Sequence, residues 1–248
     1  MIYFITRDDE IGLYSAIFLS YEKKVVPDGV IFGSEQISFT DTAIQVERNA
    51  EKADRVKKCL LTCRTKRAVS DIAVALKCGE QDKLTFIFYY AKLVIDNKNL
   101  DISGNFANFY VLNFNDAIRR VFNEVHRFKG FLRFAESTQG FLYAHFTPDN
   151  DITEYLVPHF FARLNKTPFI IHDVKRNRVG ISDGKRYKTF DAGNKSVTIF
   201  LSDAEKEFVS LWRDYYNSVN LKERKNLKQM FNYMPARYHK DLPEKNGF

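Results

Sequence analysis

The chain is poor in cysteine and lacks histidine in its first half. Its three cysteines, Cys59, Cys63 and Cys78, are odd in number, so they do not predict a disulfide framework. A zinc or cluster site would need a further ligand, and no histidine precedes His126. We therefore expect buried thiols in a reducing compartment and no metal.

Long apolar runs are also absent. No stretch approaches the roughly 20 residues that span a bilayer. The opening apolar residues, Met1 to Ile5, are too few for a signal peptide and run into acidic Asp8, Asp9 and Glu10. These features predict a cytoplasmic protein.

Several signature motifs are missing. The chain contains no GxxxxGK[ST], GxGxxG, HExxH, CxxC or GxSxG, so the corresponding nucleotide, metal and hydrolase sites are not expected. No cofactor is predicted. The remaining groups for acid–base chemistry are carboxylates and imidazoles, but their spacing selects no reaction and leaves open whether the protein is an enzyme. They are Glu124, His126, His145, His159 and Asp173.

The excess of positive charge is confined to the second half of the chain. Residues 1–112 hold 15 Lys+Arg and 15 Asp+Glu, whereas residues 113–248 hold 23 and 16, which accounts for the whole net charge of +7. A basic region beside a neutral one is typical of proteins that bind nucleic acid or another polyanion. An ordinary basic surface is the alternative.

The stretch from Asn113 to Pro148 joins the clearest helix to the clearest hairpin. Asn113 or Asn115 can cap a helix that begins near Asp116, and Gly130 suits its C-terminal end. One apolar stripe at helical spacing predicts the buried face: Phe114, Ala117, Ile118, Val121, Phe122, Val125 and Phe128. The opposite face carries Arg120, Asn123, Glu124 and Arg127, with Arg119 and His126 at the border.

Two alternating runs, FLRFAE and FLYAHF, predict the hairpin. A loop at Thr138–Gly140 places Phe134 opposite Ala144 and Leu132 opposite Phe146, which gathers the apolar side chains on one face. The other face then shows Arg133, Tyr143 and His145, with Arg133 directly across from His145. This polar face is either a solvated one or a surface for a polyanion.

Residues 1–100 read as a mostly helical, neutral region. We expect a strand at Ile2–Ile5 and either strands or extended loop at Val30–Phe32 and Ile37–Val46. Helices are expected from Asp8 or Asp9 to Lys24, and at Asn49–Arg64, Ser70–Gly79 and Gln81–Val94. The loose connection at 96–112 is the expected boundary. Residues 101–248 would form a basic α+β region, although the two can also be one integrated domain.

After the hairpin, the pattern predicts a helix, three strands and two helices. Pro158 either kinks the first helix or begins it, and Tyr155, His159 and Arg163 fall on one side. The strands are expected at Thr167–Val174, Arg178–Ile181 and Arg186–Phe190, turning at Lys175 and Arg176 and again at Ser182-Asp183-Gly184. This order predicts a mainly antiparallel sheet packed with helices, an α+β fold.

The end of the chain predicts two more helices. Ser202 or Asp203 would cap the first, which runs to about Val219. Asn220 would cap a basic helix from Lys222 to about Phe231, followed by a tail that contains Arg237 and Tyr238. The expected core face of the first helix comprises Ala204, Phe208, Leu211, Trp212, Tyr215 and Val219.

The segments VHRFKGFLRFAE, LYAHFTPDND, PHFFARL, IHDVKRNRVGISDG and MPARYHKDLPE resemble a bacterial family known as "probable DNA metabolism protein". The likeness extends to the opening FITRDDEIGLYSAIFLSYEKK and to AEKADRVKKC. The family's motif residues map onto Glu124, His126, Arg127, Gly130, Phe131, Arg133, Phe134, His159, Phe160, Arg163, Asp173, Arg176, Met234, Pro235, Arg237 and Tyr238. The resemblance implies a protein that accompanies a radical-SAM protein in DNA modification or repair. Some larger relatives carry a uracil-DNA-glycosylase-type domain, and this chain is too short to include one.

Three functions follow as hypotheses. The first is a DNA-binding accessory to the radical-SAM partner, whose phosphate and base contacts would come from Arg119, Arg120, Arg127, Arg133, Tyr143, His145, Arg163, Lys175, Arg176 and Arg237. The second is a DNA-processing enzyme with Glu124, His126, His159 or Asp173 as acid or base. The third is a protein-interaction partner that does not bind DNA.

Overall fold

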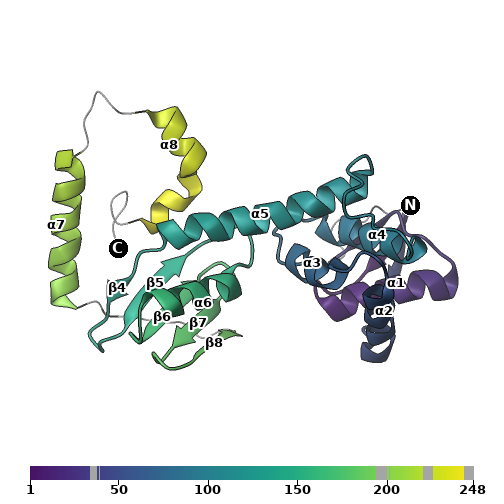
Figure 1. Cartoon of the computed structure of the whole chain (residues 1–248), viewed down its shortest axis with the longest axis horizontal. Helices are drawn as coiled ribbons and strands as arrows, with labels where there is room; N and C mark the ends of the chain where they lie inside the picture. Colours follow the sequence, from purple (N-terminus) through teal and green to yellow (C-terminus); the bar gives the residue numbers. More distant parts are fainter. Residues whose placement is uncertain (34–37, 39, 194–199, 201, 220–225, 243–248) are drawn as a thin grey trace. The chain divides into compact units, whose positions relative to one another are not determined.

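The computed structural model describes residues 1–33, 38, 40–193, 200, 202–219 and 226–242 (Figure 1). The chain divides into two compact units, Met1–Phe122 and Asn123–Phe248. The division falls inside helix α5 (Phe109–Phe131), later in the chain than the loop expected at 96–112. Each unit is described by itself.

The first unit is a small parallel sheet with helices. Its strands, β1 (Ile2–Ile5), β2 (Gly29–Ile31) and β3 (Thr42–Gln45), lie in the order β2-β1-β3. The helices are α1 (Glu10–Lys23), α2 (Ala50–Thr62), α3 (Ala68–Ala75) and α4 (Lys83–Asp96). Asp9 and Asn49 cap α1 and α2 by accepting from the backbone N–H of Gly12 and Lys52. The helices and the first two strands expected from the sequence are confirmed to within a few residues. The third strand begins only at Thr42, and positions 37 and 39 of its expected range lie outside the described residues.

The core of this unit is aromatic and aliphatic. Phe4 on β1 packs edge-on against Phe88 on α4, and both are fully buried. Cys63 and Cys78 are buried and Cys59 is partly buried, all outside any disulfide. This agrees with the expected thiols.

The second unit is built on a mixed five-stranded sheet. Its strands are β4 (Ala135–Glu136), β5 (Leu142–Phe146), β6 (Phe169–Asp173), β7 (Arg178–Ser182) and β8 (Tyr187–Asp191), in the order β4-β5-β6-β7-β8. Only β5 and β6 pair in parallel, and α6 (Thr153–Arg163) joins them. The remaining pairs are antiparallel, which confirms the α+β prediction.

Glycine lets α6 lie close to the sheet. A Cβ on Gly180 of β7 would stand 2.1 Å from Cγ2 of Val157 on α6. Val157 is fully buried, as are Leu156 on α6 and Ile171 on β6. Pro158 lies inside α6, so it does not begin the helix.

The hairpin register is confirmed, but its first strand is short. Ala135 pairs with Tyr143, the register that also places Phe134 level with Ala144. Gly140 closes the loop with a φ of +79°. Residues 132–134 lie outside any strand, so Arg133 does not pair across from His145; its guanidinium donates instead to the carbonyl of Gly130, 2.6 Å away.

The bounds of α5 differ from the prediction. Asn108, not Asn113 or Asn115, accepts from the backbone N–H of Tyr110 and Val111, and the helix begins at Phe109. Gly130 lies within the helix, which continues to Phe131. Asn108 caps the helix because two backbone N–H donors lie within reach of its side chain. The Asn113 and Asn115 side chains instead donate to backbone carbonyls one turn earlier.

The C-terminal helices also correct the prediction. Ser202 caps α7 (Asp203–Val219) as expected, since its hydroxyl accepts from the Glu205 backbone. The expected core face is wrong, because Phe208, Leu211 and Tyr215 are 60%, 67% and 57% exposed and Val209 is buried instead. Asn226 caps α8 (Leu227–Tyr233), and the expected cap Asn220 and helix start lie outside the described residues. The 3-10 helix η2 (Ala236–Asp241) follows.

Candidate functional site

Glu124, predicted as an acid or base, is a buried anchor. Its side chain lies on α5 and the residue is 3% exposed. Its carboxylate accepts from the backbone N–H of Asp149 and of Asn150, both at 2.8 Å. It also accepts from Asn150 Nδ2 and from the Tyr238 hydroxyl, both at 2.6 Å. With four donors satisfied, this carboxylate holds the loop after β5 and the tail in place.

Asp173 is a second buried carboxylate with a structural partner. It is fully buried, and it accepts from Nη1 of Arg176 at 3.0 Å and from the Arg176 backbone at 3.2 Å. The same guanidinium donates to the carbonyls of Pro148 and Asp149. Burial raises the pKa of Asp173, and the charge of Arg176 opposes that rise. Asp173 and Arg176 thus fix the turn after β6.

Other predicted phosphate contacts are also ion-paired. Arg119 pairs with Asp116 at 3.0 Å, and Arg120 pairs with Glu80. Arg237 Nε lies 2.7 Å from Asp149, and its guanidinium stacks 4.7 Å from the centroid of the Tyr238 ring. A phosphate could use these groups only by competing with a carboxylate.

The end of α5 and α6 carry another group of basic side chains. Lys129, His159 and Arg163, which we name the α5–α6 cluster, make no ion pair with any carboxylate among the described residues. His159 and Arg163 are one helical turn apart on α6. The centroids of the His159 and Phe160 rings are 5.0 Å apart. The Phe160 ring centroid is also 5.0 Å from that of Phe134, which follows α5 closely.

The pKa of His159 reflects its two basic neighbours. Burial lowers the pKa of His159, and the charges of Lys129 and Arg163 lower it further. The Nε2 atom of His159 is buried and has no hydrogen-bond partner among the described residues. Sequence reasoning chose His159 and Arg163 but missed Lys129.

The remaining predicted residues are placed as follows. His126 and Lys175 are exposed, and Arg127 is half-buried. None of the three has a carboxylate ion pair within the described parts of the chain.

A hydrogen-bonded chain of side chains lies on the sheet face opposite α6. The Tyr143 hydroxyl lies 3.0 Å from Nδ1 of His172, and Nε2 of His172 lies 2.9 Å from Oδ1 of Asn177. The Asn177 amide nitrogen donates to the carbonyl of Gly193, which orients its oxygen toward the imidazole. A neutral His172 therefore carries its proton on Nε2 and accepts at Nδ1 from Tyr143.

His145 lies beside this chain on the same face. Its ring stacks on Tyr143 with centroids 6.0 Å apart and 29° between the planes. Burial lowers the pKa of His145, Asp241 raises it and His172 lowers it. Tyr143 and His145 were predicted from the sequence as site residues, whereas His172 and Asn177 were not. Alternation along Phe169–Asp173 would have placed His172 on the face of Tyr143.

Some site types have no support in the structure. Among the residues described, no group of three or more His, Cys, Asp or Glu side chains could hold a metal ion. None of the described helices has the length and apolar character needed to cross a membrane.

The second unit is therefore an α+β unit that carries the α5–α6 cluster and a tyrosine–histidine–asparagine chain. The chain belongs to the family described as "Domain of unknown function (DUF4130)", whose model matches residues 81–244. This match contains every residue of the α5–α6 cluster and leaves most of the first unit outside it. Neither the curated proteins nor the solved structures contain a match.

Proposed function

We propose that the protein binds nucleic acid through the α5–α6 cluster, as an accessory in DNA modification or repair. The observation that supports this most directly is that Lys129 and Arg163 act on His159 electrostatically, and that none of the three makes an ion pair with a carboxylate in the described part of the chain. Phosphates supply the missing negative charge, and the net charge of +7 favours a polyanion over a neutral ligand.

Binding to fluorescent single- and double-stranded DNA at several salt concentrations tests the proposal. If about three phosphates are neutralised, the slope of log K against log salt should be about −2 to −3, and slightly smaller for single strands. Lys129→Met and Arg163→Met should each weaken binding. Arg119→Met removes an ion-paired arginine and should leave affinity nearly unchanged. Absence of binding to both DNA forms at low salt would contradict the proposal.

The partner in this proposal comes from the resemblance to the "probable DNA metabolism protein" family, which implies a radical-SAM protein. The exposed apolar side chains of α7, Phe208, Leu211 and Tyr215, offer a place for a protein to dock. This part is tested separately by co-purification: the radical-SAM protein should co-purify with the wild-type chain and less well with the Leu211→Glu variant. Co-purification without any DNA binding would favour a protein-interaction role alone.

A second candidate function is chemistry on the nucleic acid. The arrangement Tyr143–His172–Asn177 places a hydroxyl against an imidazole that a third group orients, which is the usual geometry of an activated nucleophile or acid. This favours His172 over Glu124 and Asp173, whose oxygens hold the fold. Processing of lesion-containing oligonucleotides should then be lost in His172→Gln and kept in His126→Gln, since His126 is exposed.

A further inference from the structure

The two faces of the mixed sheet differ in how far their side chains are exposed. On the face against which α6 packs, Ala144, Phe146 and Ile171 are fully buried (Figure 1). On the opposite face, which we name the β5–β8 face, most side chains are partly or largely exposed. The strand register gives its residues: Tyr143, His145, Ile170, His172, Val179, Ile181, Lys188 and Phe190.

Aromatic rings gather on the β5–β8 face. Tyr143 and His145 are two residues apart on β5, both are partly exposed, and their rings stack with centroids 6.0 Å apart. Phe190 on β8 lies in the same row across the sheet as His145 and is 44% exposed. The Tyr143 ring is held in place, because its hydroxyl lies 3.0 Å from Nδ1 of His172. The face therefore presents fixed rings on β5 and an exposed ring on β8.

The charge of the β5–β8 face suits a phosphate backbone. Its eight positions include no aspartate or glutamate, and Lys188 is exposed. Lys175, in the turn directly after β6, is exposed as well. The carboxylate of Asp241, whose charge acts on His145, accepts from both the backbone N–H and the hydroxyl of Thr147. Aromatic rings combined with cations are the usual platform for single-stranded nucleic acid.

We propose that the β5–β8 face binds the unpaired bases of a single-stranded nucleic acid, which stack on Tyr143, His145 and Phe190. The choice of a nucleic acid rests on the proposed function, whereas the choice of unpaired bases rests on this face. Protein rings stack on bases that are splayed out in loops, ends and single strands, because a duplex covers the flat faces of its bases. The face is separate from the α5–α6 cluster, since α6 packs on the other side of the sheet.

The first experiment uses the intact chain and a DNA strand of alternating adenine and cytosine, about ten nucleotides long. Methyl signals are followed by NMR as the DNA is added. We expect the ring currents of the bases to shift the methyl signals of Ile170 and Ile181. Ile171, the next residue of β6, is fully buried on the other face and is the internal control that should not move. Unmoved signals from Ile170 and Ile181 in the bound state would overturn the inference.

The second experiment measures affinity for the same DNA strand and for a duplex that contains it. Phe190→Leu and Tyr143→Leu remove a ring but keep an apolar side chain, and each should weaken single-strand binding about tenfold, the ratio that about 1.4 kcal/mol gives. Tyr143→Phe keeps the ring and should keep the affinity. Tyr187→Leu is the matched control, because Tyr187 is also on β8 and 44% exposed but contacts Phe161 of α6. Duplex binding should be unchanged in all four variants.

The outcomes separate this inference from the proposed function. Salt-dependent binding of both DNA forms, with Phe190→Leu and Tyr143→Leu equal to the wild type, contradicts the role of the β5–β8 face alone. Absence of binding to either form contradicts the proposed function and this inference together. Loss of partner co-purification in Phe190→Leu, with unchanged affinity for the single strand, assigns the face to protein docking instead. If a leucine variant melts early, the isoleucine signals of the intact chain decide.

Discussion

Glu124→Gln should destabilise the second unit strongly. Its carboxylate accepts four hydrogen bonds in a buried site, and glutamine replaces one of the two acceptor oxygens by an NH₂ donor. Hydrogen bonds to a charged group contribute about 1.5–3 kcal/mol each, and an unsatisfied buried donor costs about 1–3 kcal/mol. Because the amide can turn and Tyr238 can rotate its hydroxyl, we expect a loss of about 2–4 kcal/mol. The melting temperature should fall by about 5–15 °C.

Two measurements locate the effect. Urea denaturation gives the free energy of unfolding, and amide hydrogen exchange at Asp149 and Asn150 should speed up because their N–H groups lose their acceptor. Glu136→Gln, an exposed change in the same unit, is the matched control. A double-mutant cycle with Tyr238→Phe should give a coupling of about 1 kcal/mol or more. Surface substitutions usually change the free energy of unfolding by less than about 0.5 kcal/mol. If Glu124→Gln changes it by no more than that, the hydrogen bonds of Glu124 do not stabilise the unit as argued.

Three further predictions concern the same unit. Gly180→Ala places a methyl group against a buried valine of α6 and should lower the free energy of unfolding by about 1–3 kcal/mol. Gly130→Ala, in open space within α5, should raise it by about 0.5–1 kcal/mol. Urea denaturation midpoints of the two variants and the wild type check both values. Because the folded state holds the pKa of His159 below its usual value, the unfolded chain takes up the proton first, so stability declines as the pH falls below about 6.5. His159→Gln should flatten that decline, again in urea titrations. Nitrogen-15 NMR should find neutral His172 protonated on Nε2, and Tyr143→Phe should shift its Nδ1 signal.

The local parts of the fold could be predicted from the sequence because their causes are local. Alternation and Gly140 were enough to set the register of β4 and β5, since slipping by one residue would exchange the two faces. The cap Asn49 was also predicted, because it stands just before an amphipathic run, and Asp9 was one of the two residues expected to cap α1. The start of α5 was missed because several asparagines compete there, and only the fold selects Asn108.

The candidate site could be predicted only in part, because ion pairs join residues that are far apart in sequence. No local pattern links Arg120 to Glu80 or Arg237 to Asp149, yet these pairs decide which cations remain for a ligand. The face of α7 was wrong for a related reason. Apolar spacing shows that a helix has one apolar face, but it does not show whether other described residues pack against that face.

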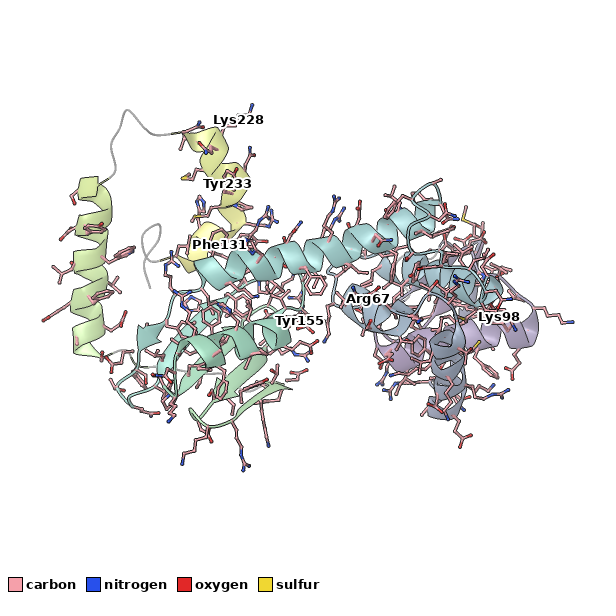
Figure 2. The ribbon with its side chains drawn as sticks, viewed as in Figure 1. Arg67, Lys98, Phe131, Tyr155, Lys228 and Tyr233 are labelled. Carbon is pink, nitrogen blue, oxygen red and sulfur yellow. The ribbon has the colours of Figure 1, made fainter. Side chains whose placement is uncertain are left out.

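The contact between Glu124 and Tyr238 has a consequence for synthesis of the protein. The two residues are 114 positions apart, and Tyr238 lies on η2. The Tyr238 ring also packs against Phe128 and Phe131. Figure 2 labels Phe131 at the end of α5. A nascent chain on the ribosome therefore presents the mixed sheet long before Tyr238 emerges. Until then, the carboxylate at residue 124 lacks one of its donors and the aromatic end of α5 lacks its cover. That interval is when a chaperone would be most useful to this protein.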